Sequence, residues 1–568
     1  MNFLTVAADT AETQIPYATI FFIILYVAII AVLTFLGNKK TKTAQDYIIA
    51  GRDTNPFIMA LSYGATFIST SAIVGFGGVA ANFGMGLLWL CFLNIFVGVF
   101  IAFVFFGRRT RKMSVNISSS SFPELIGKRF DSKFIQIFIG SVIFIFMPIY
   151  AAAVLKGGVD FIATTFNLNY DFALLILTAI VAITVTLGGL KGVMYVDSFQ
   201  AIIMSAGILF LVIFTYIKLG GVVEAHTQLT ELIKNPAVIE QTQGNIDKGF
   251  LGWTSMPSLG SPIWWNIVSS IILGVGIGVL AQPQLAVRFM TVKSNRDLNR
   301  ALLSGGLFIV ILVGGMYTVG SLSNVVFFQD LGKISMVAAG GVNDRIIPKF
   351  INDYIPSWFN VVFILALLSA AMSTLGSQFH TMGIAFSKDI YMRSVSEEKR
   401  NKINASKKQS ILLTRIGMYL SIVITFVLAW LSSKLDGSVA IIATGTSLFF
   451  GLCAASFLPS FFAGLYIKKM PKTAAIASII SGFISSIIMI FFINEKTATN
   501  LQLCRLITGK PYLIQGTAIE YLKMVDSIVI SLPISIIVMV ICYFVCKNTI
   551  SDEHIEKCFQ SNKKSEVK

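Results

Sequence analysis

The chain has 568 residues, of which 55% are hydrophobic and only 13% charged, and its mean hydropathy is +0.78. These values lie outside the range of soluble domains and indicate a protein with many membrane spans. Six cysteines without a Cys-x-x-Cys pair, and only three histidines, argue against a zinc site or a disulfide framework. The meaning of the net charge of +16 depends on which side of the membrane the basic residues occupy.

Thirteen apolar windows are long enough to cross a bilayer as helices of about 20 residues. They lie near 16–37, 56–82, 84–107, 134–155, 171–189, 197–217, 262–286, 301–324, 357–386, 411–433, 439–467, 473–493 and 525–546. With the N-terminus outside, 32 of the 44 Lys and Arg residues fall on the inside. The positive-inside rule therefore predicts an outside N-terminus, an inside C-terminus and basic cytoplasmic loops, and not a nucleic-acid surface.

The sequence predicts one transmembrane domain, residues 16–546, between an extracellular segment, 1–15, and a cytoplasmic tail, 547–568. The tail is short and polar, so we expect it to be disordered. No stretch outside the windows is long enough to bury a core of its own, which argues against a catalytic domain. We therefore expect a multi-pass protein of the cell membrane that is not an enzyme. It should contact the lipid bilayer, and we predict neither nucleic acid nor an obligate protein partner.

The window at 56–82 is interrupted near its centre by Ser69-Thr70-Ser71, and three glycines follow within two turns. Glycine costs about 1 kcal/mol in a helix interior, and hydroxyls compete for backbone hydrogen bonds, so a break is expected here. At bilayer depth an unwound turn leaves carbonyls that must line a polar cavity or bind something. Carbonyl and hydroxyl oxygens suit a small alkali cation. The alternative is a seam of small residues that lets helices pack closely.

The window at 357–386 contains a second polar interruption. Four of its residues share one helical face, because they are spaced i, i+3, i+4 and i+7. They are Ala370, Ser373, Thr374 and Ser377. Two hydroxyls and a carbonyl of this face would point the same way. The alternative is again close packing, with each hydroxyl bonded to the preceding turn.

Asp197 begins the otherwise uncharged window at 197–217. Ionisable groups inside membrane helices are rare and indicate an ion or proton pathway. The alternative is a helix N-cap, where aspartate is favoured by its hydrogen bonds and by the helix dipole. The residues alone leave both interpretations open.

With further motifs in the same order, these elements resemble the sodium/solute symporter family, which includes proline, sugar, sialic acid and pantothenate carriers. The resemblance covers roughly residues 16–546. Its further motifs are Thr43-Ala44-Gln45-Asp46-Tyr47, Ala50-Gly51-Arg52, Phe122-Pro123-Glu124-Leu125, Arg129-Phe130, the run from Ala281 to Met290, and Lys388-Asp389-Ile390-Tyr391. It implies an all-α LeuT-type fold with about 13 transmembrane helices, built on two inverted five-helix repeats at about 56–217 and 262–467.

The resemblance also implies a sodium site between the two interrupted windows, with Na⁺ as the coupling ion. Its ligands would be the backbone carbonyls of Ala65, Ile68 and Ala370 and the hydroxyls of Ser373 and Thr374. Asp197 and Ser377 match residues that lie behind this site or, in some members, hold a second sodium. Because Gly376 stands where that second site would have a hydroxyl, we expect one sodium per solute.

The same resemblance implies a solute site between the broken helix and the window at 262–286. The matching residues are Phe67, Ser69, Thr70, Ser71, Val275, Val279 and Gln282. Proline carriers have an aspartate where Phe67 stands and aromatic residues in place of the two valines, and the amide and acidic groups of sugar carriers are absent. The valines and hydroxyls favour a carboxylate of the pantothenate or monocarboxylate kind, which hydroxyls and helix N-termini can hold.

We therefore expect a sodium-coupled symporter that imports a small organic solute by alternating access. The alternatives within this class are symporters of proline, other amino acids or sugars. Outside it stand a proton-coupled carrier in which Asp197 relays protons, and a transporter-like solute sensor. The short tail favours a carrier over a sensor.

Overall fold

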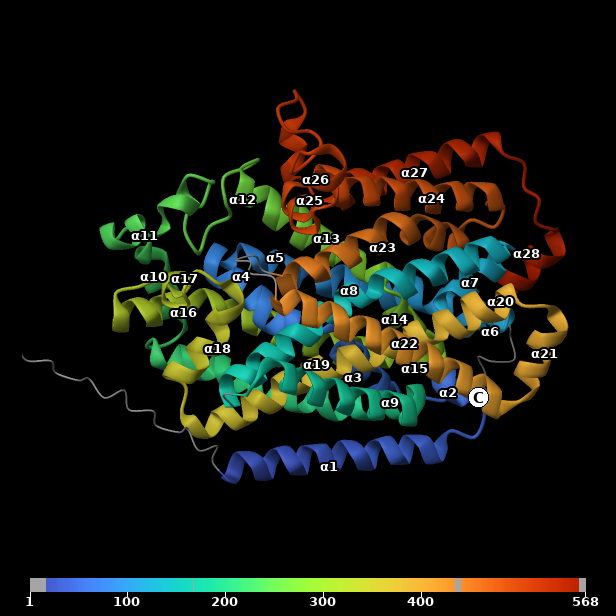
Figure 1. The fold of residues 1–568 in the computed structure, drawn as a ribbon, viewed down its shortest axis with the longest axis horizontal. Coiled ribbons are helices and arrows are strands. Elements are labelled where there is room, and N and C mark those ends of the chain that lie inside the picture. The colour runs from blue at the N-terminus through green and yellow to red at the C-terminus, as the bar shows by residue number, and fades with distance from the viewer. Residues whose placement is uncertain (1–16, 167, 435–440, 561–568) are drawn as a thin grey trace, which may run out of the picture.

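Nearly all of the described chain is helical, and its long helices lie side by side (Figure 1). This computed structural model describes residues 17–166, 168–434 and 441–560, and no strand occurs among them. Within these described ranges, eleven helices are long and apolar enough to cross a membrane, and a twelfth span results when one bent pair is counted together. The predicted segment 1–15 and residues 561–568 lie outside the described residues. The described chain has the all-α class that composition predicts.

Long helices alternate with short ones along the chain. The first half contains α1 (Tyr17–Lys40), α2 (Ala44–Ile49), α3 (Pro56–Phe67), η2 (Ser71–Gly75), α4 (Phe76–Phe83), α5 (Leu88–Ile95), η4 (Phe96–Gly107), α6 (Arg108–Asn116), α7 (Phe122–Arg129), α8 (Lys133–Phe166) and α9 (Tyr170–Lys218). The second half contains α12 (Pro262–Trp265), η5 (Asn266–Leu273), α13 (Gly274–Gly278), η6 (Val279–Ala281), α14 (Pro283–Ala286), η7 (Val287–Met290), α15 (Asn295–Ile309), η8 (Val310–Gly314), α16 (Gly315–Leu331), α19 (Ser357–Ile384), η9 (Ala385–Tyr391), α22 (Lys407–Lys434), α23 (Ile441–Tyr466), α24 (Lys472–Ile488) and α27 (Ser527–Val545). Connecting helices are α10 (Val222–Leu232), α11 (Pro236–Ile246), α17 (Ser335–Ala338), α18 (Asn343–Tyr354), α20 (Met392–Ser394), α21 (Glu397–Ala405), α25 (Glu495–Leu501), α26 (Leu503–Thr508) and α28 (Asp552–Phe559).

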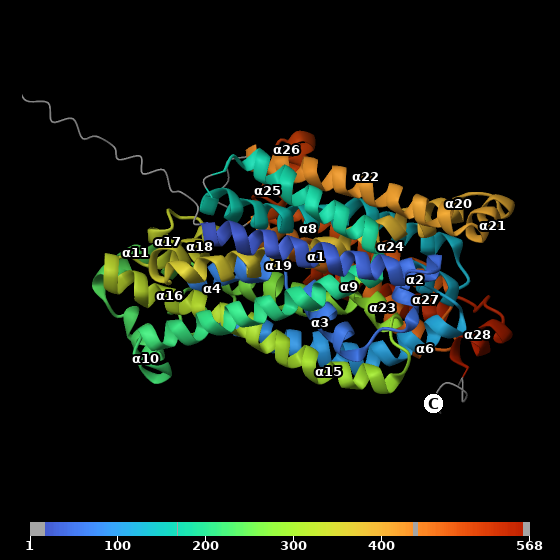
Figure 2. The same cartoon turned by 90° about the horizontal axis from the view of Figure 1, so that it is seen from below.

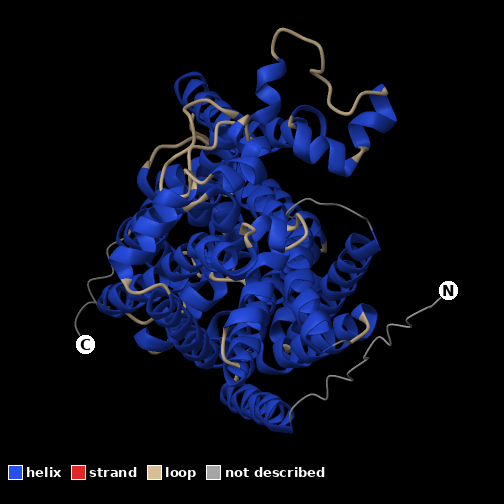
Figure 3. Cartoon of the chain, turned by 90° about the vertical axis from the view of Figure 1, so that its left-hand side faces the viewer, coloured by secondary structure: helices blue, strands red, loops and turns tan. Residues whose placement is uncertain are grey.

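Most of the connecting helices gather at the two ends of the bundle (Figures 1 and 2). One end has α10, α11, α17 and α18, and the other has α2, α20, α21 and α28. Figure 3 looks along the bundle from the first end and shows helices joined by loops. Helix α1, the first described helix, begins towards the first end, and α28, the last one, lies at the second end. An odd number of spans would likewise place the two ends of the chain on opposite sides of the membrane. The count of thirteen spans and the side of each terminus stay predictions.

Helix α9 covers two of the predicted windows. It has 49 residues and is kinked at Gly189, whose φ of 57° lies in the left-handed region. A straight helix of this length would be about 73 Å long, more than twice the about 30 Å of bilayer hydrocarbon. Asp197 lies well inside the part of α9 that follows the kink. Asp197 is therefore not an N-cap in this structure, and that interpretation of the residue is wrong.

Two helices are broken near their centres, one in each predicted repeat. Helices α3 and η2–α4 are bent by 56° at a break where Ile68 is extended (φ −91°, ψ 101°). In the second half the helix from Pro262 ends at Ala281, and Gln282 is extended (φ −73°, ψ 116°). Pro283 follows, and a proline disfavours helical backbone in the residue before it. The two breaks expose backbone groups inside the bundle that other helices must satisfy.

The tail is partly ordered, which corrects the prediction that it is disordered. Helix α28 buries the side chains of Ile555 and Cys558, which are 5% and 1% exposed. The Asn116 amide donates hydrogen bonds to the carbonyls of Cys558 and Gln560, at 3.2 and 3.0 Å. Two apolar residues one turn apart thus give this short polar segment a face that packs on the end of the bundle.

Candidate cation and solute site

The break after α3 leaves carbonyls without helical partners. The last four carbonyls of any α-helix lack intrahelical hydrogen bonds. Those of Ala65 and Thr66 accept hydrogen bonds from α19 instead, from the hydroxyls of Ser373 at 2.9 Å and Thr374 at 3.2 Å. The two hydroxyls therefore join the broken helix to α19 by satisfying groups that the break exposed.

Helix α19 is continuous through its small polar residues, which therefore share a helical face as their spacing predicts. Its residues Ala370, Ser373 and Thr374 are fully buried. The Ser373 hydroxyl lies 3.3 Å from the Ala370 carbonyl as well as 2.9 Å from that of Ala65. Side chains on one unbroken face hold these oxygens more precisely than a loop would, because the helix backbone is rigid.

The structure brings three of the five predicted sodium ligands into direct contact: Ala65, Ala370 and Ser373. Thr374 bonds to Thr66, which is not in the predicted set. Ile68 lies at the break, and no hydrogen bond joins its carbonyl to this cluster in the part of the chain that the structure describes. Neutral carbonyl and hydroxyl oxygens fit a hard cation such as Na⁺, since a hydroxyl can rotate its hydrogen away and offer a lone pair.

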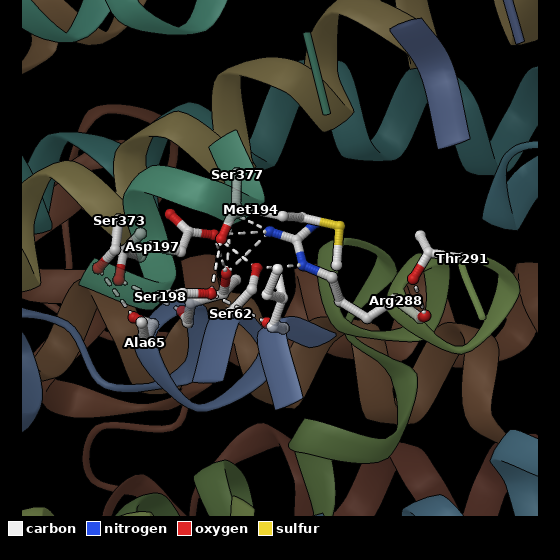
Figure 4. A network of polar contacts seen from close by, with 12 residues as sticks. Ser62, Ala65, Met194, Asp197, Ser198, Arg288, Thr291, Ser373 and Ser377 are labelled. Atoms are coloured by element: carbon white, nitrogen blue, oxygen red, sulfur yellow. Dashed lines mark hydrogen bonds and ion pairs between the residues drawn. The ribbon is translucent and has the colours of Figure 1, made fainter. Parts of the chain in front are cut away.

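A second polar cluster lies next to the first and centres on Asp197, whose side chain is 1% exposed (Figure 4). Its Oδ2 atom accepts hydrogen bonds from the hydroxyls of Ser62 at 2.7 Å and Thr66 at 3.4 Å. It also forms an ion pair with Arg288 Nη2 at 3.1 Å. Ser377 joins the cluster through its hydroxyl, 2.8 Å from that of Thr66. Four separate elements, α3, α9, η7 and α19, thus contribute side chains to one polar cluster.

Arg288, Ser62 and Thr66 are members of this cluster that the sequence analysis does not assign to the site. The positive-inside count treats Arg288 as an inside loop residue, whereas the structure buries it. Signals for all three are present in the sequence. Ser62 and Thr66 are four residues apart and so share a helical face. Arg288 follows the Gln-Pro break closely, within the apolar run at 281–290.

The predicted solute-site residues are all buried, but their hydrogen bonds lead to different helices. They are Phe67, Ser69, Thr70, Ser71, Val275, Val279 and Gln282. The Thr70 hydroxyl donates to the Val154 carbonyl of α8 at 2.8 Å, and the Ser71 hydroxyl accepts from Thr446 of α23 at 2.8 Å. No hydrogen bond joins the hydroxyls of the break to Gln282 among the described residues. A solute bound here would compete for the hydroxyls with α8 and α23.

Comparison with known proteins identifies relatives of the whole domain. The model of the sodium:solute symporter family matches residues 47–482. The chain is 27% identical over 465 residues to a sodium/pantothenate symporter of Haemophilus influenzae, covering 81% of this chain and 87% of that protein. It is 25% identical over 500 residues to sodium/proline symporter 2 of Staphylococcus saprophyticus, covering 86% and 89%.

A solved structure shares the fold over nearly the full chain. It is a Na⁺-coupled sialic acid symporter in a substrate-bound outward-open state. The TM-score is 0.70 at 20% sequence identity, with 94% of this chain and 98% of that chain covered. The LeuT-type arrangement expected from the motifs is therefore the fold of this protein.

Proposed function

Since this chain belongs to the sodium:solute symporter family, it is a sodium-coupled membrane carrier and not an enzyme, and we propose that it imports a small organic carboxylate. The observation that carries the proposal is the junction between α3 and α19. There, the Ser373 and Thr374 hydroxyls lie against carbonyls freed by a helix break. An oxygen-lined junction between a broken helix and its neighbour can bind an ion, and the two helices can separate when the ion leaves.

We infer that the coupling ion binds at this junction, with Ala65, Ile68, Ala370, Ser373 and Thr374 as its ligands. All five ligand atoms are neutral, so they replace part of the hydration shell without a formal charge that would trap the ion. Binding of this kind reverses easily, as each transport cycle requires.

The ion couples to the solute through the break itself. A ligand shifts a conformational equilibrium only when it binds one state more tightly than the other. The proposed ligands are divided between α3 and α19, so movement of the inner half of the broken helix away from α19 separates them. Sodium therefore favours the state in which the junction is closed, and its departure releases α3.

A carboxylate is the solute class that the break favours. Residues Ser69, Thr70 and Ser71 precede or begin the helical segment η2–α4, whose N-terminus carries partial positive charge. Phe67 and the two valines of α13 and η6 supply apolar surface rather than a carboxylate that would bind an amine. The relationship to a sodium/pantothenate symporter agrees with this choice.

A proline-type zwitterion is the second candidate, because a sodium/proline symporter is among the relatives. Uptake into proteoliposomes separates the two. Purified protein would be tested with an inward sodium gradient, or with choline in place of sodium, against labelled pantothenate, short monocarboxylates, proline, a hexose and sialic acid. We expect sodium-dependent accumulation of a carboxylate without an amino group. Accumulation of proline alone would replace the proposal by the second candidate, and accumulation driven by a pH gradient in choline would refute sodium coupling.

A further inference from the structure

Arg288 is a cation enclosed within the bundle. Its side chain is 1% exposed. Besides the ion pair with Asp197, its guanidinium donates hydrogen bonds to Ser62 at 3.1 Å, to Thr66 at 3.0 Å, and to Ser377. Figure 4 shows Ser62, Asp197 and Ser377 on one side of the guanidinium. A buried charge is costly unless it is paired and hydrogen-bonded, and this one has both kinds of partner.

The oxygens around Arg288 are the kind that bind a metal cation. One carboxylate oxygen and three hydroxyl oxygens converge there, from α3, α9 and α19. They include Asp197 and Ser377, which are the residues expected to hold a second sodium if one were bound. The guanidinium hydrogen-bonds to these same oxygens. A sodium ion at this position would have to displace it, because two cations in contact would repel each other.

The other side of the Asp197 carboxylate offers no equivalent set of oxygens. Its Oδ1 atom receives no hydrogen bond from the described residues, and Figure 4 shows it turned away from the guanidinium. Asp197 borders a cavity of about 10 Å³, the size of a single water molecule. The cavity wall is mainly apolar, formed by Val181, Val193, Val196 and Met372. The Thr184 hydroxyl also borders it and donates to the Ile180 carbonyl of its own helix at 2.8 Å. Gly376, which also borders it, carries no hydroxyl.

We propose that Arg288 is a tethered cation that takes the place of a second sodium ion, so that this carrier binds one sodium per transport cycle. The inference rests on the proposed function, because it assumes a sodium ion at the junction of α3 and α19. The arginine is covalently attached to η7. It neutralises Asp197 in every state that keeps the pair, and it is not released with the solute.

Equilibrium binding of ²²Na⁺ to the purified full-length protein in detergent tests the inference without measuring transport. We expect one sodium per protein. Arg288→Met leaves the Asp197 carboxylate without its cation, so this variant should bind two sodium ions, and its melting temperature should rise more steeply with sodium concentration. Arg288→Lys keeps the charge and should bind one. The double variant Arg288→Met with Asp197→Asn removes both charges and should also bind one.

Arg129→Met is the matched control. Arg129 is another buried arginine, 1% exposed, but it donates to the carbonyls of Gly464 and Ile467 at the end of α23, away from the carboxylate. Its loss should lower stability and leave the sodium count at one. Two sodium ions on the unmodified protein, two on Arg288→Lys, or only one on Arg288→Met would each overturn the inference. If Arg288→Met does not fold, the counts for the unmodified protein and for the lysine variant decide. No sodium bound to the unmodified protein would instead refute the proposed function.

Discussion

Two hydroxyl groups, one from Ser373 and one from Thr374, join the broken helix α3 to α19. Ser373 and Thr374 each donate to one carbonyl of the last turn of α3, and both side chains are fully buried. A buried carbonyl without a partner costs about 1–3 kcal/mol, so these two contacts also stabilise the break. The same atoms that compensate for the break are the ones we propose to bind sodium.

Removing either hydroxyl should weaken sodium binding. For Ser373→Ala and Thr374→Val we expect the loss of about 1.5 kcal/mol of ion binding, which corresponds to a roughly tenfold rise in the sodium concentration for half-maximal stabilisation. Thermal unfolding of the purified variants across a sodium titration would measure this shift. Ser421→Ala and Thr215→Val are matched controls, because these buried hydroxyls bond only to the preceding turn of their own helices, at 2.8 and 2.7 Å. Unchanged sodium dependence in both Ser373→Ala and Thr374→Val would contradict the site.

At the scale of helices, the carrier depends on where helices break or bend. The α3 break lies at Ile68 and Ser69, where the run of hydroxyl residues begins, and the second break lies at Gln282-Pro283. The bend in α9 has a different origin, because Gly189 packs directly against the Tyr47 ring. This bend separates the two predicted windows of α9 and leads into the segment that holds Asp197.

Gly189→Ala should destabilise the bundle. A Cβ atom at this position would lie 2.6 Å from Tyr47 Cδ2, and the φ of 57° disfavours any L side chain. We expect a loss of at least about 2 kcal/mol, visible as a lower melting temperature in detergent. Gly244→Ala in α11 is the control, because a Cβ atom there meets nothing within 4 Å. A melting temperature for Gly189→Ala equal to that of the unmodified protein would show that the contact can relax.

An ion-pair group centred on Glu124 joins α7, which lies between two candidate membrane spans, to η9. The Glu124 carboxylate lies 2.7 Å from Lys128 Nζ and 3.4 Å from Lys388 Nζ, and accepts a hydrogen bond from the Ser120 amide at 2.8 Å. Burial acts to raise the pKa of Glu124, but the two lysines and the hydrogen bonds outweigh it and lower this pKa from 4.5 to about 2. A carboxyl with a depressed pKa stabilises the fold above its ordinary value and loses that contribution as the pH falls.

Glu124→Gln should therefore lower stability at neutral pH and flatten its decline between pH 4.5 and about 2. The shift corresponds to about 3 kcal/mol. Thermal unfolding of both proteins over this pH range would measure the difference. The control is Glu231→Gln, since Glu231 is 56% exposed and pairs only with Lys234 three residues away. Parallel pH profiles for Glu124→Gln and the unmodified protein would remove the role assigned to this carboxylate.

The whole molecule combines two broken helices, one in each repeat, with a single proposed ion junction. If one sodium accompanies each monovalent carboxylate, no net charge crosses the membrane in a cycle. A cycle that moved one net charge would instead gain about 2.3 kcal/mol per 100 mV. The response of uptake to membrane potential therefore reports how many sodium ions move.

Carboxylate uptake should not respond to a potential imposed by potassium and valinomycin. We expect equal initial rates with and without an inside-negative potential, at a fixed sodium gradient, in proteoliposomes. Faster uptake of the monocarboxylate under the same conditions would require more than one sodium per cycle and would contradict the role proposed for Arg288.

Much of this protein could be predicted from local sequence. Length and hydropathy are enough to predict an all-α membrane protein, because each bilayer-spanning helix must be about 20 residues long and apolar. The run Ser69-Thr70-Ser71 predicts the break after α3, because hydroxyls and glycines weaken a helix locally. The spacing of Ser373 and Thr374 predicts their shared face, since helical periodicity depends only on position in the chain.

Only the tertiary structure decided which distant groups meet. The sequence predicts Arg288 to be one of several basic residues in a cytoplasmic loop. In the fold it instead pairs with Asp197, 91 positions away in the chain. Likewise, the hydroxyl of Thr374 is paired with the carbonyl of Thr66 rather than with that of Ala65. These pairings depend on how the helices pack against one another. A buried charge or hydroxyl bonds to the partner that the fold places within hydrogen-bond distance, and local sequence does not specify that partner.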